Sequence, residues 1–294
     1  MHKGNSYQNY IKIFCVVCLI FFNPFFISCI FPASLNLDHT KIRLLLKPNE
    51  TKSSTIEVEN PTNQDILVKV YAQDWIYTSS HDGAKDFYPS GTLPRSASRW
   101  ISFFPNEFIL PAISKQKVKY TIKVPSQAEG TYVTVLFFET DIGNQSRQGT
   151  EMNIKLRIGS LFYIDVEPLK RDITFNSLSI LQDKESLALK LTGIIHNIGN
   201  QDITLDGQFH ILDKQGMVFC RGEFNRVYTL PGDSHLIEAI CHQKLLKGIY
   251  DIVMTFDAGK SQEETGFKGG PIIVKEIAIE IDDKGNLISW QASN

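Results

Sequence analysis

Apolar and polar residues alternate almost perfectly in two segments of this 294-residue sequence. In residues 151–158, EMNIKLRI, every second residue is apolar, and residues 117–124 repeat the pattern. Successive side chains of a β-strand point to opposite faces of the sheet, so the pattern predicts strands with one apolar face. No segment shows a convincing 3.6-residue repeat of an amphipathic helix. The apolar residues of the first segment are Met152, Ile154, Leu156 and Ile158.

Short segments rich in Val, Ile, Thr, Tyr and Phe follow one another from about residue 37, separated by Pro, Gly, Asn and Asp. Residues 36–165 hold about seven or eight of them, the strand count of an immunoglobulin-like sandwich. A second series occupies residues 166–275, and residues 276–294 read as a C-terminal hairpin or tail. The sequence therefore predicts an all-β fold with two immunoglobulin-like β-sandwich domains in tandem.

Residues 1–34 have the character of an export segment. Lys3 and Lys12 precede a long apolar run, which is the pattern of a secretory signal peptide. The run is also long enough for an uncleaved N-terminal anchor, and both interpretations stay open. In either case we expect the rest of the chain to be exported, with membrane contact only through this segment.

The cysteines divide into two groups. Three of the five lie in the apolar N-terminal segment, which leaves Cys220 and Cys241 as an even pair in an oxidising compartment. We expect a disulfide that closes a loop of about 20 residues and stabilises the fold by about 3 kcal/mol. The alternative is two buried free thiols. No His or carboxylate accompanies the pair at metal-ligand spacing, so no metal site is expected.

Charge and motif content exclude several function classes. The formal net charge is -2, whereas nucleic-acid-binding domains are strongly basic. The sequence contains no G-x-S-x-G, no H-E-x-x-H and no Gly-rich phosphate loop before a helix. We therefore expect a binding protein that is not an enzyme and uses no cofactor.

Six short motifs follow one another in residues 36–165. They are LDHTK at 37–41, IEVENP at 56–61, AQDWI at 72–76, FILP through QKV at 108–118, GTY through FE at 130–139 and RIGSLFY at 157–163. In this order they resemble motifs of the PapD-like periplasmic chaperones that assemble pili. The resemblance implies an immunoglobulin-like domain, a periplasmic location and a chaperone function, whereas the second sandwich carries no motif of the family.

The family's mechanism implies a role for the alternating segment. A pilin subunit is a sandwich that lacks its last strand, and the chaperone inserts its own strand into the resulting groove. By resemblance, Met152, Ile154 and Leu156 would enter the groove, with Ile158 nearer the domain body. The implied partners are a pilin-like or fibre subunit and an outer-membrane usher. The same four side chains would also suit the core of their own sandwich, so that alternative stays open.

The resemblance also implies a clamp of two basic residues for the subunit's terminal carboxylate. Lys41 occupies the first position. At the second, this chain has Gly159-Ser160 where the family has one Lys, and Arg157 reaches the site if a bulge at Gly159 redirects the strand. The altered clamp, the unfamiliar second domain and the N-terminal segment favour an alternative function, an envelope-anchored interaction protein that binds cell wall or surface proteins.

Overall fold

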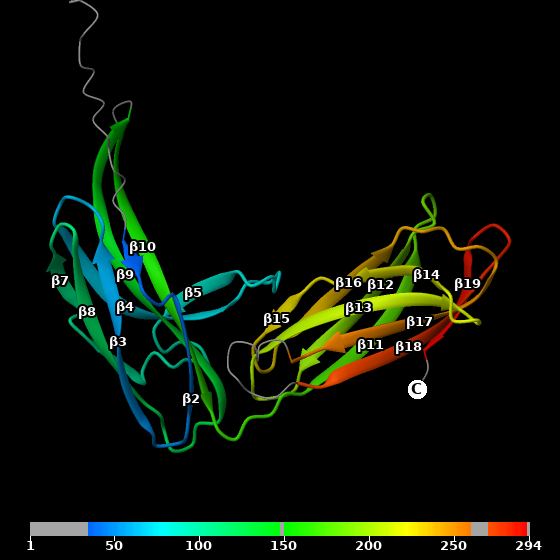
Figure 1. The fold of residues 1–294 in the computed structure, drawn as a ribbon, viewed down its shortest axis with the longest axis horizontal. Coiled ribbons are helices and arrows are strands. Elements are labelled where there is room, and N and C mark those ends of the chain that lie inside the picture. Colours follow the sequence, from blue (N-terminus) through cyan, green and yellow to red (C-terminus); the bar gives the residue numbers. More distant parts are fainter. Residues whose placement is uncertain (1–34, 148–149, 260–269, 293–294) are drawn as a thin grey trace, which may run out of the picture. The chain divides into compact units, whose positions relative to one another are not determined.

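The structure is a computed structural model that describes residues 35–147, 150–259 and 270–292. The expected export segment, residues 1–34, therefore lies outside the described residues. The described residues form strands, turns and loops arranged in four sheets (Figure 1). The prediction of an all-β chain with two sandwich domains is confirmed. Among the described residues, no helix has the length and apolar character needed to cross a membrane.

The first sandwich packs two sheets around a core that includes Ile56, Val58, Phe138 and Phe162. Its described strands pair antiparallel except β2 and β10, which are parallel. One sheet contains β1 (Asn36–Leu37), β3 (Thr51–Asn60), β8 (Ser114–Lys123) and β6 (Ile101–Phe104). The other contains β2 (Lys41–Leu46), β10 (Thr150–Val166), β9 (Gly130–Arg147), β4 (Ile66–Tyr77) and β5 (Lys85–Pro89), with β7 (Glu107–Leu110) paired to β4.

The second sandwich also packs two sheets around one apolar core. Cys220 and Cys241 form the expected disulfide, which joins β14 of one sheet to β16 of the other. The first sheet contains β11 (Ile173–Gln182), β12 (Leu189–Asn197) and β16 (Ser234–Cys241). The second contains β14 (Val218–Glu223), β13 (Ile203–Asp213), β17 (Gly248–Asp257), β18 (Ile272–Ile281) and β19 (Leu287–Ala292), with β15 (Val227–Thr229) paired to β13.

The expected C-terminal hairpin is part of the second sandwich. β18 pairs with β17 along its whole length and with β19 on its other side. Three isoleucines of β18, Ile277, Ile279 and Ile281, are buried in the domain core. Because β18 begins at Ile272, it extends across the position at which the sequence suggests a boundary, and its alternating isoleucines explain why it joins the sheet.

Candidate functional site

The N-terminal half of β10 has an open edge. β10 pairs with β9 along its whole length, from Thr150↔Arg147 to Val166↔Gly130. On its other side, β2 pairs only with Leu161–Val166. Among the described strands, none pairs with this side of residues 150–160. We call this stretch the open edge. It presents unpaired backbone N–H and C=O groups, which can accept another strand.

The apolar face of the open edge continues the core of the first sandwich. Phe162 and Ile164, on the same face further along β10, are fully buried. Leu156 and Ile158 are only partly buried and pack against the rim of that core. Ile154 is half-buried, and the side chain of Met152 lies outside the described part of the chain. The packing of these residues therefore falls off toward the end of the strand that has no second neighbour.

Arg157 lies on the opposite face of β10, over an aromatic ring. Its guanidinium carbon is 4.2 Å from the centroid of Phe137. The neighbouring carboxylate of Glu139 accepts a hydrogen bond from the Tyr71 hydroxyl at 2.7 Å and pairs with Lys155 at 3.0 Å. These two contacts, that of Tyr71 first, lower the pKa of Glu139.

The bulge at Gly159 on which the role of Arg157 depends is not formed. Within the described pairs of β9 and β10, the register shifts only between Ile154 and Lys155. Gly159 pairs regularly with Phe137, and a Cβ there would come within 2.8 Å of Val135 and 3.0 Å of Phe137. This glycine makes room for tightly packed neighbours and does not redirect the strand. Arg157 therefore stays four residues along β10 from Leu161, about 13 Å at the usual strand rise.

Lys41 lies at the start of β2, beside Leu161. Its ammonium nitrogen is 5.0 Å from the ring centroid of Tyr163, within the range of cation–π attraction. The Tyr163 ring in turn packs edge-on against Trp75, with centroids 5.1 Å apart. Lys41 is thus placed beside an aromatic cluster of Trp75, Tyr77 and Tyr163.

A second lysine, which the sequence analysis missed, approaches the same aromatic cluster. The Lys85 ammonium nitrogen is 5.2 Å from the ring centroids of both Trp75 and Tyr77. Burial, and secondly the positive charge of Lys41, lower the pKa of Lys85. The structure thus brings Lys85, rather than the expected Arg157, to the aromatic cluster beside Lys41. We call Lys41 and Lys85 the lysine pair.

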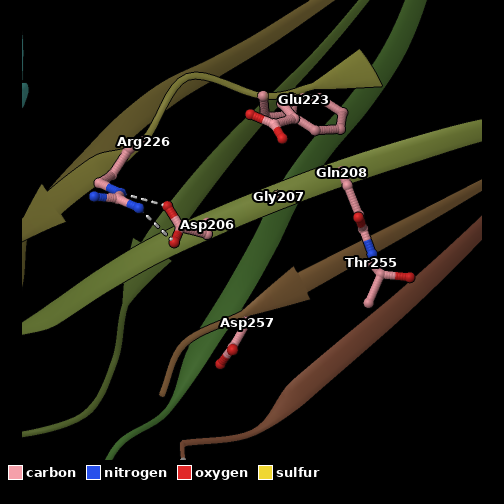
Figure 2. Close-up of a pocket in the computed structure, with 8 residues that line it drawn as sticks. Asp206, Gly207, Gln208, Glu223, Arg226, Thr255 and Asp257 are labelled. Carbon is pink, nitrogen blue, oxygen red and sulfur yellow. Dashed lines mark hydrogen bonds and ion pairs between the residues drawn. The ribbon is translucent and has the colours of Figure 1, made fainter. Parts of the chain in front are cut away.

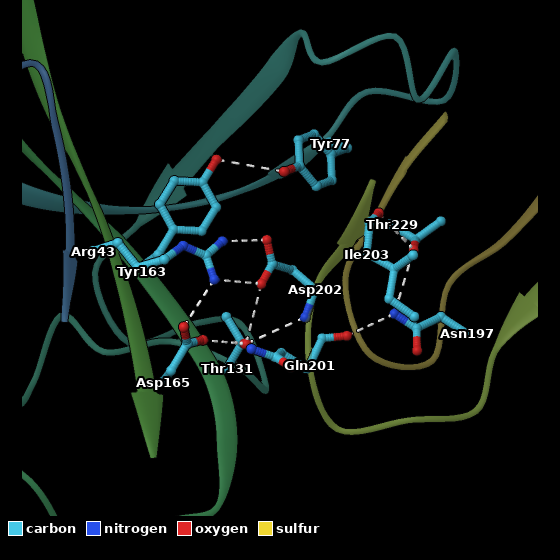
Figure 3. A network of polar contacts seen from close by, with 10 residues as sticks. All are labelled: Arg43, Tyr77, Thr131, Tyr163, Asp165, Asn197, Gln201, Asp202, Ile203 and Thr229. Carbon is cyan, nitrogen blue, oxygen red and sulfur yellow. Dashed lines mark hydrogen bonds and ion pairs between the residues drawn. The ribbon is translucent and has the colours of Figure 1, made fainter. Parts of the chain in front are cut away.

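A buried ionic network lies against Tyr163, the ring that Lys41 contacts (Figure 3). Arg43 lies over the Tyr163 ring at 4.6 Å and donates hydrogen bonds to Asp165 and Asp202, each at 2.8 Å from its Nη1 atom. Its Nη2 atom also pairs with Asp202. Thr131 donates to Asp165 at 2.6 Å. Burial raises the pKa of Asp165, although Arg43 and Thr131 oppose that shift.

The second sandwich contains a concavity that is lined mainly by polar and charged residues (Figure 2). Its volume is about 510 Å³, and its lining includes Asp206, Glu223, Arg226 and Asp257. Arg226 pairs with both carboxylate oxygens of Asp206, at 2.6 and 3.0 Å, so these two charges neutralise each other. Nowhere in the described ranges do three or more His, Cys, Asp or Glu side chains gather to hold a metal ion.

Comparisons with known proteins find similarity only among solved structures. No family model matches the chain, and no curated protein matches it. A chain from a structure of a chaperone–tip adhesin complex in CFA/I fimbriae biogenesis is 14% identical, with a TM-score of 0.48, over 83% of this chain and 98% of that chain. The class 5 fimbriae chaperone CfaA gives 14% identity, a TM-score of 0.47 and the same two coverages.

A third structure is the CsuC–CsuE chaperone–tip subunit complex of archaic Csu pili from Acinetobacter baumannii. It is 13% identical, with a TM-score of 0.41, over 82% of this chain and 98% of that chain. The match to PapD-like pilus chaperones extends over most of the chain. Such identities and TM-scores describe a likeness of fold and assign no function.

Proposed function

We propose that this protein is an exported periplasmic chaperone that binds a pilin-like or surface-fibre subunit by donor-strand complementation. The observation that carries the proposal is the open edge of β10, in which unpaired backbone and a half-buried apolar face coincide. A subunit lacking one strand has the matching deficit, an apolar groove with unpaired backbone groups. Backbone pairing would supply affinity, and the alternate side chains would supply specificity. An outer-membrane usher would then receive the complex.

Burial of apolar side chains would favour insertion of the open edge into the groove of a subunit. Full burial of an exposed aliphatic side chain is worth roughly 1.5–3 kcal/mol. Because Leu156 and Ile158 are already partly buried, we expect each to contribute less than this range, and Ile154 to contribute nearer to it. Ordering of the two partners offsets part of the gain. The backbone ladder is therefore an essential part of the proposed affinity.

We assign the subunit's terminal carboxylate to the lysine pair. Lys41 keeps the position that the resemblance implies, and Lys85 takes the place of Arg157. Two ammonium groups at one aromatic cluster repel each other, and an anion bound between them would relieve that repulsion. The half-buried position of Lys85 strengthens such a contact relative to one in open solvent.

Co-expression with a subunit tests the proposal. The probe is a pilin-like subunit from the same genome whose sandwich lacks its last strand. We expect Leu156→Asp to reduce recovery of the soluble complex by about tenfold or more, because the charge would have to enter an apolar groove. Leu181→Asp is the matched control, since Leu181 is 58% exposed on β11 of the second sandwich. Unchanged recovery with Leu156→Asp would contradict the proposal.

The altered clamp also supports a second candidate, an envelope-anchored protein that binds cell wall or other surface proteins. Its motivating observation is the regular pairing at Gly159, which leaves Arg157 away from the position implied by the family. The two candidates differ in the surface they use. Binding of isolated cell wall that persists in Leu156→Asp, without recovery of any subunit, would favour the second candidate.

A further inference from the structure

The loop between β4 and β5, residues 78–84, contacts β15 of the second sandwich through paired hydrogen bonds. The Tyr228 N–H donates to the His81 carbonyl at 2.9 Å, and His81 Nδ1 lies 2.8 Å from the Tyr228 carbonyl. The Tyr228 ring packs 5.7 Å from that of Tyr77. Gly83 adopts a φ of 100°, and a Cβ there would be 3.2 Å from the Tyr228 ring. The loop therefore depends on close backbone contact with β15.

Two histidine rings meet at this contact. The centroids of His81 and His235 are 4.5 Å apart, with an interplanar angle of 38°. Because the partner of His81 Nδ1 is a carbonyl oxygen, which only accepts, Nδ1 carries the proton of the neutral ring. An additional proton must bind Nε2. Charging both rings would place two positive charges about 4.5 Å apart, where they repel even in a polar environment.

The surrounding charges compensate only partly for a doubly protonated pair. Asp233 lies 3.9 Å from His81 Nδ1. It also feels the charge of His196, whose Nδ1 contacts Ser234 at 2.8 Å. Glu223 and Glu238 line the concavity that includes His235. Asp233 thus faces one further histidine, His196, besides His81 of the pair.

We propose that the contact between loop 78–84 and the β15–β16 region is a pH-sensitive latch between the two sandwiches, which loosens when both His81 and His235 are protonated. This latch is independent of the proposed chaperone function. It requires only that the hydrogen bonds between His81 and Tyr228 weaken when the rings repel each other. Because residues 78–84 link β4 to β5, the loosening would be confined to this hairpin and its partner strand.

The direction of the pH effect follows from the titration of His235. Burial, and secondly the charge of His81, lower its pKa. The closed latch therefore binds fewer protons than the open one, so it is stable above the usual histidine pKa of about 6.5 and weakens as pH falls through the lowered value. Asp233 acts in the opposite direction, because burial raises its pKa and protonation then favours the closed form.

Hydrogen exchange at the Tyr228 amide tests the latch directly, because that N–H donates to His81. In the full chain, we expect its protection, corrected for intrinsic exchange, to be about three to ten times lower at about pH 5.5 than at about pH 7.5. In His235→Gln the protection should be nearly independent of pH. His242→Gln, at an exposed position of the same domain, is the matched control and should behave like the unchanged chain.

Two results would overturn the latch. One is an equal pH dependence of Tyr228 protection in the unchanged chain and in His235→Gln. The other needs no variant: an NMR titration of the unchanged chain in which His235 titrates at the usual value of about 6.5 would show that the pair does not interact. Neither measurement requires a subunit, so failure of the latch leaves the chaperone proposal untouched.

Discussion

Both halves of β10 carry apolar residues at even-numbered positions, but they differ in their neighbouring strands. Residues 161–166 have β2 on one side and β9 on the other, and Phe162, Ile164 and Val166 are completely buried. Among the strands that the structure describes, residues 150–160 pair only with β9, and Leu156 and Ile158 are partly buried. Alternation therefore identifies a strand with an apolar face, but it does not reveal whether that face serves the chain itself or a partner.

We expect the largest difference in unfolding free energy when one apolar residue is truncated in each half of β10. Phe162→Ala should lower the free energy of unfolding by about 3–5 kcal/mol, because it opens a cavity in a closed core. Leu156→Ala should cost about 1 kcal/mol or less, since the side chain lies at the rim. Denaturant unfolding of both variants checks this. Equal losses would mean that the open edge already belongs to the core of its own sandwich.

Removal of the Arg43 charge probes the other face of the paired half of β10, on which Tyr163 and Asp165 lie. Arg43→Met leaves Asp165 and Asp202 buried without their cation, so we expect a loss of about 3 kcal/mol in unfolding free energy at neutral pH. The loss should shrink in acid, as protonation neutralises Asp165, whose pKa is already raised. Urea titrations at neutral and acid pH measure it. A loss that does not change with pH would argue against a buried ionic role.

The smallest expected effect distinguishes the two candidate carboxylate clamps, Lys41 with Lys85 and Lys41 with Arg157. Lys85→Gln should reduce subunit recovery by about tenfold, the equivalent of about 1.4 kcal/mol for one charge-assisted contact. Arg157→Gln should change it little, because Arg157 lies over Phe137. The measurement is pull-down of a subunit with its natural C-terminus, compared with a subunit whose terminal carboxylate is displaced by two added residues. A larger effect of Arg157→Gln would return the clamp to the position implied by the family.

Local patterns in the sequence predicted much of the fold. Period-two alternation identified two strands of the first sandwich, and short segments rich in Val, Ile, Thr, Tyr and Phe indicated the other strands of both sandwiches. The even pair Cys220 and Cys241 predicted the disulfide. The strand signals lie within short segments, and the disulfide was inferred from a count of cysteines. Neither inference requires knowledge of strand register. The β18–β19 hairpin was also recognisable, although its place in the second sheet depends on pairing with β17.

The site was less predictable because it depends on register and on packing between distant segments. The open edge exists because Lys41 pairs with Leu161 and with no earlier residue of β10, which no local pattern specifies. A glycine at position 159 is compatible with a bulge or with a crowded regular strand, and the rings of neighbouring strands decide between them. Lys85 reaches Trp75 only through the β4–β5 hairpin, so its sequence context carried no signal.

The chain crosses from one sheet to the other between β1 and β2, and this crossing determines whether residues 36–40 can pair with the open edge. β1 pairs with β3 in one sheet, whereas β2 pairs with β10 in the other. Had the polypeptide remained alongside β10 in the same register, residues 36–40 would lie opposite residues 156–160 and would occupy the vacancy intramolecularly. The crossover thus keeps residues 36–40 from pairing with the open edge.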